Sequence, residues 1–357
     1  MSSVRVTLRN VAQKAGVHVT TVSLALRNHA SISVTTRERI QKIADEMGYR
    51  PDPMLSALCN YRRLASAAAT PPTLAYLTEW RTREAWMSEE AHARIYAGAC
   101  ARAEHLGYAM EHLWLREPGM TTARWNKVLW TRNYGGLIIA PLPVGRGHSC
   151  LDWDRFSAIR IDPSMVRPRL HSVGNNQYQC MQIAFREARS RGYRRIGFAI
   201  KKLNNERVDL LWSAGMLTEQ ARHRDMECIP LLITARWGPE AFKEWFLRYR
   251  PDVVLSTHRK ALDWITELGI RVPKDAGFID LDCMVSNGVR AGVSQNHANV
   301  GAAAVDNLIR MIQQNERGIP SVPQTIYLDG AWVDGKTVRA IPAKTRRFDK
   351  SGGEKFI

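Results

Sequence analysis

The sequence predicts an all-α N-terminal segment followed by an α/β core of two lobes with parallel sheets. Residues 7–48 place apolar side chains at helical spacing, interrupted by Gly16 and Gly48. From residue 73 to residue 328, short apolar runs alternate with amphipathic runs of helical length, which is typical of parallel sheets covered by helices. The 357 residues also exceed what one compact core usually holds, which favours two or three domains.

The N-terminal segment predicts three short helices, over residues 8–15, 19–26 and 37–47. Thr7 precedes the first helix and Ser33 precedes the third, and both are residue types that cap helix N-termini. Gly16 and Gly48 follow the first and third helices, where a left-handed turn ends a helix.

A proline-containing break at residues 49–53 and a short helix-capable piece at residues 54–58 come next, before a small-residue linker. The sequence then changes to strands and helices, and it ends in a basic segment with KTRR and SGGEK that predicts disorder. The predicted divisions are a helical headpiece over 1–50, a short helix and linker over 51–72, a two-lobed core over 73–342, and a tail over 343–357.

For residues 73–342 the sequence predicts parallel sheets, because the expected strands are separated by segments of helical length. Strands are expected over residues 74–80, 109–115, 136–141, 156–162, 195–200, 228–233, 252–257, 276–281 and 324–328. Helices are expected over residues 91–106, 179–192, 210–220, 240–249, 260–268 and 300–314.

The charge balance favours a polyanionic partner. The formal net charge is +17, and residues 1–63 hold ten Lys and Arg against four Asp and Glu. Nucleic acid and an anionic membrane surface are the candidate partners, and a basic protein kept soluble by its charge is the alternative.

The six cysteines are widely spaced, without a C-x-x-C pair or a Cys/His cluster at metal spacing, so we expect reduced, mostly buried thiols and no metal. No apolar signal core follows the N-terminus, and no run approaches the roughly 20 apolar residues of a membrane span. The sequence therefore predicts a cytoplasmic protein without a membrane partner.

A helix, a glycine turn and a second helix form a helix-turn-helix, whose second helix enters the major groove with its N-terminal residues against base edges. In the second helix, Val22 and Leu26 are expected to turn inward. The opposite face carries Val19, Thr20 and Leu24, which we expect to contact the bases. The alternative is a three-helix interaction module that binds no nucleic acid.

The segment TLRNVAQKAGVHVTTVSLALRNHASISVTTRERIQKIADEMGYRPDPMLSAL resembles the DNA-binding headpiece of the lactose repressor/galactose repressor (LacI/GalR) family of bacterial transcriptional regulators. The residues that match the family pattern in one register are Thr7, Leu8, Val11, Ala12, Ala15, Gly16, Val17, Thr21, Val22, Ser23, Leu26, Ser33, Thr36, Arg37, Gly48, Tyr49, Pro51 and Leu58. GYRRIGFAI, GIRVPKDAGFIDLD and VSQNHANVGAAAV are similar to motifs of the family's core.

This resemblance implies a two-lobed core similar to periplasmic sugar-binding proteins. It also implies a homodimer that binds a near-palindromic double-stranded DNA operator, as a repressor controlled by a small, sugar-like effector and without a cofactor. Leu58 corresponds to the apolar wedge that opens a base step in the minor groove, although it could be an ordinary helix contact. The side chains expected to hold phosphates are Thr7, His18, Thr21, Ser23, Arg27, Ser33 and Thr36, with helix capping and packing as their alternative roles.

Three residues of the helix-turn-helix depart from the family pattern, and Asp52 and Pro53 stand at its Asn and following hinge positions. Asn10 stands where the family usually has Asp, His18 where it has Ser, and Leu24 where Arg is common. Without that Arg there is no bidentate contact to guanine, so Val19 and Leu24 are expected against thymine methyls, with Thr20 offering one hydroxyl.

An effector is expected between the two lobes, where its binding would bias their closure. Register with the family places Asp162 and Asp282 there, as acceptors for sugar hydroxyls or, alternatively, as caps of the following turns. Trp212 falls at the position of the family's arginine, with Arg207 as a possible substitute, and Thr257 replaces an asparagine. Trp212 could stack on a sugar or belong to the core.

Two other classes of protein compete with this interpretation. Residues 330–337 satisfy G-x-x-x-x-G-K-T, the phosphate-binding loop of nucleotide hydrolases, but the following residues reach Pro342 without a helical pattern. We therefore interpret GAWVDGK as a turn between late strands and expect no enzyme, since no other catalytic pattern is present. A stand-alone sugar-binding protein would need an export signal and no helix-turn-helix.

Overall fold

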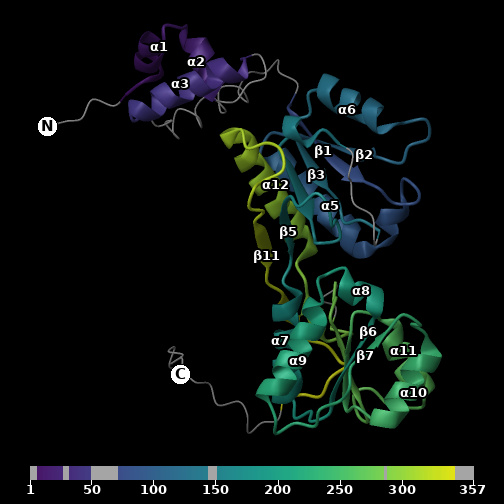
Figure 1. Ribbon diagram of the computed structural model, residues 1–357. Helices are drawn as coiled ribbons and strands as arrows, with labels where there is room; N and C mark the ends of the chain where they lie inside the picture. The colour runs from purple at the N-terminus through teal and green to yellow at the C-terminus, as the bar shows by residue number, and fades with distance from the viewer. Residues whose placement is uncertain (1–5, 27–31, 50–70, 144–150, 285–287, 342–357) are drawn as a thin grey trace, which may run out of the picture.

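The computed structural model describes residues 6–26, 32–49, 71–143, 151–284 and 288–341, which form a three-helix headpiece and a two-lobed α/β core (Figure 1). The predicted hinge helix with Leu58, Arg27 and the predicted tail lie outside these residues. The fold class expected from the sequence is confirmed.

The headpiece helices are α1 (Leu8–Ala15), α2 (Val19–Leu26) and α3 (Val34–Glu46). Their apolar faces meet in one small core, which holds Val11, Ala12, Ala15, Val22, Ala25, Ile40 and Ala44. Thr7 caps α1 as predicted, and Asn10 completes the cap by accepting from the Thr7 backbone N–H at 2.8 Å. Ser33 caps α3, which begins three residues earlier than the expected residue 37. Gly16, with φ of 65°, ends α1 in the left-handed conformation.

The first lobe is built on a six-stranded sheet in the order β11-β5-β4-β3-β1-β2, and all of its strand pairs are parallel. Its strands are β1 (Thr73–Thr78), β2 (Ala109–Trp114), β3 (Gly136–Ile139), β4 (Ala158–Ile161), β5 (His171–Asn175) and β11 (Thr325–Leu328). Helices α5 (Glu90–His105) and α12 (His297–Gln314) cover one face, and α6 (Thr122–Thr131) covers the other. Two short 3-10 helices, η1 (Ala85–Ser88) and η2 (Trp153–Arg155), complete the lobe.

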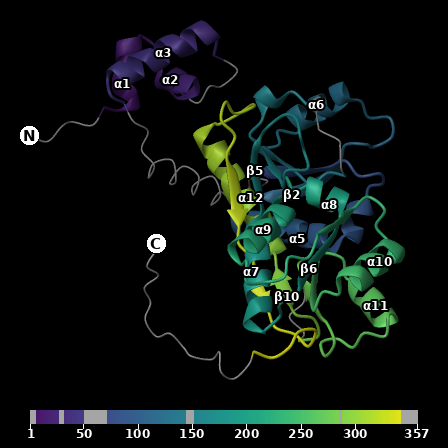
Figure 2. The same ribbon diagram turned by 60° about the horizontal axis from the view of Figure 1, so that its bottom comes forward.

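The second lobe has a sheet in the order β12-β10-β9-β8-β6-β7, in which the edge strand β12 pairs antiparallel with β10 and the other pairs are parallel. Its strands are β6 (Ile196–Lys201), β7 (Leu232–Thr234), β8 (Val253–Ser256), β9 (Gly277–Asp280), β10 (Gly292–Ser294) and β12 (Ala331–Val333). Its helices are α7 (Gln177–Ser190), α8 (Lys202–Glu206), α9 (Leu211–Arg222), α10 (Pro239–Tyr249) and α11 (Lys260–Glu267). Figure 2 shows α7 and α9 on one side of β6, with α10 and α11 on the other.

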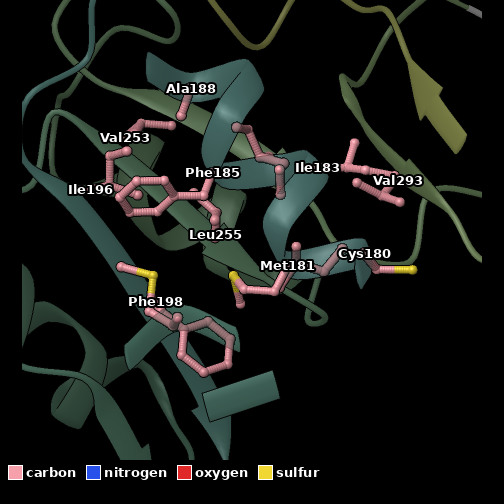
Figure 3. Packing of buried hydrophobic residues seen from close by; sticks show 14 of the residues in the cluster. Cys180, Met181, Ile183, Phe185, Ala188, Ile196, Phe198, Val253, Leu255 and Val293 are labelled. Atoms are coloured by element: carbon pink, nitrogen blue, oxygen red, sulfur yellow. The ribbon is translucent and has the colours of Figure 1, made fainter. Parts of the chain in front are cut away.

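One hydrophobic core of the second lobe lies between α7, α9 and the sheet, and another lies between the sheet and helices α10 and α11. Figure 3 shows Met181 and Phe185 of α7 among apolar side chains of β6 and β8, such as Phe198 and Leu255, and all four are buried. Burying each such side chain stabilises the fold by about 1.5–3 kcal/mol.

The chain crosses between the lobes three times, after β5, after β10 and after β11. Helix α12 therefore follows a strand of the second lobe but packs on the sheet of the first, where its yellow-green ribbon lies among teal elements (Figure 1). Gly98 and Gly301 allow α5 and α12 to touch through their backbones, because a Cβ on Gly301 would lie 1.9 Å from the Ile95 carbonyl oxygen.

Most predicted elements are confirmed with shifts of a few residues, but the strand expected over residues 228–233 forms only as β7. Pro230 lacks the N–H that a strand interior needs. Helices α6 and α8 and strands β5 and β10 were not predicted from the sequence. The interpretation of GAWVDGK as a turn was wrong in part, since Ala331–Val333 form β12.

Candidate nucleic-acid interface and interlobe site

The outer face of α2 carries the predicted base contacts. Thr20 is exposed and Leu24 half-buried, and their spacing of four residues places them on the same side of the helix. Val19 instead packs against the headpiece core beside Val22, so the expectation that it points away from that core is wrong. The sequence pattern was ambiguous because Val19 lies in the first turn, close to the end of α1.

His18 directly precedes α2, and its carbonyl oxygen accepts from the Val22 N–H at 3.2 Å. The His18 Nδ1 atom lies 2.8 Å from the Thr20 Oγ1 atom and accepts from the Thr20 backbone N–H at 3.4 Å. His18 therefore occupies the N-cap of α2 and also contacts the hydroxyl of an exposed residue on the outer face.

The predicted phosphate contacts have a structural role as well in two cases. The hydroxyls of Thr7 and Ser33 accept from the backbone N–H groups of Asn10 and Thr36 at the starts of α1 and α3. Thr21, Ser23 and Thr36 are half-buried, and Thr7, His18 and Ser33 are exposed.

Helix N-termini favour anions because their N–H groups carry partial positive charge. The described part of the headpiece adds exposed cations at Arg9, Lys14, Arg39 and Lys42. No acidic residue lies in the first turn of α1, α2 or α3. This arrangement suits a surface that faces a phosphate backbone.

In the core, Asp162 and Arg207 meet across the two lobes. Asp162 directly follows β4, and its Oδ2 atom accepts from Arg207 Nη2 at 3.1 Å, with the side chains 13% and 20% exposed. Its Oδ1 atom accepts from the Ser164 N–H at 2.7 Å, so the turn-capping role also holds.

Asp282, which follows β9 in the second lobe, accepts from Nε2 of His297, the first residue of α12, at 2.7 Å. Because α12 packs on the first lobe, this bond also joins the two lobes. Nearby, Arg259 contacts the buried Asp280 and reaches Glu90 of α5, both at 3.5 Å. Burial raises the pKa of Asp280.

His92 of α5 interacts electrostatically with Arg207 and His297. Burial, with a smaller contribution from the Arg207 charge, lowers the pKa of His92 to about 3, so its ring is neutral. Within the described residues, the His92 Nδ1, His297 Nδ1 and Tyr76 hydroxyl atoms are buried without a hydrogen-bond partner. Such atoms are available to a small polar ligand.

Neither His92 nor His297 was predicted from the sequence as a member of this site. His297 lies in the motif VSQNHANVGAAAV, so the register with the family could have indicated it, whereas no pattern singles out His92.

The other two predicted effector residues, Trp212 and Thr257, make their contacts within the second lobe. Trp212 is 3% exposed and packs inside the second lobe with Met216. It is therefore a core residue, and its ring is not available to stack on a sugar. The Thr257 hydroxyl contacts His258 Nδ1 at 3.0 Å, and the His258 ring lies edge-on to Trp237 at 4.6 Å between ring centroids.

The phosphate-loop match has no phosphate-binding geometry. Residues 331–333 are a strand, and no helix follows in the described residues up to 341. A Cβ on Gly335 would lie 2.1 Å from the Arg290 backbone, so this glycine serves close packing.

The described ranges contain no group of three or more His, Cys, Asp or Glu side chains able to hold a metal ion. None of the helices described is both long and apolar enough to cross a bilayer.

Comparison with known proteins agrees with this geometry. Residues 7–52 match the family described as bacterial regulatory proteins, lacI family. The chain is 28% identical over 134 residues to the HTH-type transcriptional regulator GalR of Lacticaseibacillus casei, an alignment that covers 37% of this chain and 34% of that protein. It is 50% identical over 48 residues to the HTH-type transcriptional repressor CytR of Escherichia coli (strain K12), covering 13% and 14%. The alignments thus span about a third or less of these relatives' own lengths.

Among solved structures, the lac repressor dimer bound to operator and the anti-inducer ONPF superposes with a TM-score of 0.55 at 20% identity, covering 94% of this chain and 100% of that one. The complex of the transcriptional regulator CelR with cellobiose gives 0.56 at 18% identity, covering 93% and 100%. These likenesses establish the fold.

The helical headpiece and the paired parallel sheets define a helix-turn-helix protein with a periplasmic-binding-protein-like core. Residues 7–52 of the chain thus resemble the lacI family of bacterial regulatory proteins, and the fold of the chain is that of the lac repressor.

Proposed function

We propose that this protein is a sequence-specific DNA-binding transcriptional regulator, a repressor that binds a near-palindromic operator as a homodimer. The observation that carries the proposal is the headpiece, in which α2 presents an exposed Thr20 and a half-buried Leu24 beside helix N-termini free of acidic residues. Two-fold symmetry would place two such helices in successive major grooves. The matched relatives named above are regulators. Their role supports the proposals that this protein is not an enzyme and that it is cytoplasmic.

In this function, Thr20 and Leu24 contact base edges, with Leu24 against a thymine methyl, and Val19 supports them from the headpiece core. The residues assigned to phosphates are Thr7, His18, Thr21, Ser23, Arg27, Ser33 and Thr36. Leu58, outside the described residues, is assigned to the minor-groove wedge of the hinge.

The effector site is assigned to the junction of the lobes. Asp162, Arg207 and Asp282 offer charged groups there, and the unpaired atoms of Tyr76 and His92 offer further contacts. Such a set suits a small polyhydroxylated molecule of the sugar class, because carboxylates accept from hydroxyls and arginine donates to them. Thr257, on the second lobe, is a candidate effector contact at the edge of this site.

The test of DNA binding begins with a selection from random-sequence duplexes with the full chain. We expect a near-palindromic operator and an affinity that falls steeply with salt, with a log–log slope of several units, because several cations face phosphates. Recovery of no sequence, or binding that does not depend on salt, would contradict the proposal.

The test of effector control is a thermal-shift screen of sugars and nucleosides against the full chain, followed by operator binding with each hit. An effector should change operator affinity by about 1–3 kcal/mol, the usual range of allosteric coupling. Hits that stabilise the protein but leave operator affinity unchanged would contradict the coupling.

A further inference from the structure

The contact between His18 and Thr20 constrains what the Thr20 hydroxyl can offer to DNA. His18 Nδ1 lies 3.4 Å from the Thr20 backbone nitrogen, which carries a hydrogen directed at it. A ring nitrogen that accepts this hydrogen has to carry a free lone pair, so we assign His18 the tautomer with its ring hydrogen on Nε2.

The Thr20 Oγ1 atom lies 2.8 Å from the same Nδ1 atom. Because Nδ1 has no hydrogen to give, the hydroxyl is the donor in this contact. Its single hydrogen is directed at His18, and only the oxygen lone pairs face outward. Thr20 is exposed, so those lone pairs are presented on the outer face of α2.

We propose that His18 is a specificity-determining positioning residue, which holds the Thr20 hydroxyl as a pure hydrogen-bond acceptor and so selects a base with a major-groove amino group. This inference rests on the proposed DNA-binding function. Adenine and cytosine carry such amines, on N6 and N4, whereas guanine and thymine present carbonyl oxygens at the corresponding positions. A freely rotating threonine hydroxyl could serve either set.

The experiment measures operator affinity of the full chain for four duplexes that differ only at the base facing Thr20. That base is located as the position whose preference disappears in Thr20→Val, which removes the hydroxyl but keeps the shape. We expect wild type to favour adenine and cytosine over guanine and thymine by about three- to tenfold, the effect of one hydrogen bond.

Two variants separate the positioning role from helix capping. His18→Gly should keep most of the cap, since glycine at an N-cap costs only a few tenths of a kcal/mol relative to a polar cap, but it offers no side-chain acceptor. The preference should then fall below about twofold. His18→Asn restores an acceptor oxygen at the cap and should restore the preference.

The inference is overturned if wild type favours guanine or thymine at this position, if His18→Gly keeps the wild-type preference, or if no position responds to Thr20→Val. None of these outcomes contradicts the proposed DNA-binding function, because an operator is still selected in each case. Failure to select any operator would instead overturn the proposed function, and this inference with it.

Discussion

The ion pair between Asp162 and Arg207 should be a measurable part of what holds the two lobes together. The test removes each charge separately and then both, as Asp162→Asn, Arg207→Met and the double variant. Asn suits position 162 because it keeps an oxygen for the Ser164 N–H and tolerates the backbone φ of 61°.

The size of the effect follows from the geometry. At the 3.1 Å separation of the two charged atoms, the attraction is about 5 kcal/mol with an effective dielectric constant of about 20. Partial burial, with 13% and 20% of the side chains exposed, imposes a desolvation cost that offsets much of this. We therefore expect a coupling free energy of about 1–3 kcal/mol, between the values for exposed and fully buried pairs.

The assay is urea unfolding of the wild type and the three variants, analysed as a double-mutant cycle. A matched cycle on Arg102 and Asp306, an exposed pair at 2.7 Å that joins α5 to α12 within the first lobe, should give less than about 1 kcal/mol. If the free energies of unfolding lost in the two single variants at 162 and 207 sum to the loss in the double variant within about 0.5 kcal/mol, the pair does not couple the lobes. That result would refute the reasoning.

Three further predictions concern the helix packing, the buried histidine and the hinge. Gly301→Ala should lower the thermal midpoint of unfolding, because the new Cβ would lie 1.9 Å from the Ile95 carbonyl oxygen. Helix propensity alone predicts the opposite, a gain in stability of up to about 1 kcal/mol, so a higher midpoint would contradict the close contact. Burial lowers the pKa of His92 to about 3. The free energy of unfolding should therefore fall as pH drops from about 6.5 toward 3, because the unfolded chain then binds a proton at His92 that the folded protein excludes. The slope is at most about 1.4 kcal/mol per pH unit, and chemical unfolding of His92→Gln should show a flatter slope; equal slopes would argue against a buried neutral ring. Leu58→Ala should weaken operator binding by a few kcal/mol and reduce DNA bending in a gel-shift assay, while the thermal midpoint of the core stays unchanged; equal bending would remove the wedge role.

The sequence predicted the headpiece closely because its signals are local. Thr7, Gly16 and Ser33 mark helix ends through contacts within three or four residues. The strand β5 escaped prediction because His171, Ser172 and Asn175 are polar residues that the fold nevertheless buries. Their burial depends on distant partners, such as Glu316 for His171, which no local pattern contains.

The interlobe site could be predicted only in part for the same reason. Asp162 and Arg207 were identified from the resemblance, but Trp212 was assigned to the site although its side chain turns into the lobe. Aligning a helix with a family pattern does not determine which of its faces is buried when both faces carry apolar residues. The pairing of His297 with Asp282 depends on α12 leaving the second lobe, which is a property of the whole topology.

The path of the chain between the lobes also bears on how the protein is made. A ribosome releases β1 to β5 of the first lobe before any of the second, yet α12 emerges about 120 residues after β5. At 5–20 residues per second this interval lasts roughly 6–24 s. Throughout it, the sheet surface formed by Ile159, Ile161 and Val173 lacks the helix that finally covers it. During this interval the nascent first lobe is an incomplete sheet with an uncovered apolar face, the kind of surface that chaperones bind.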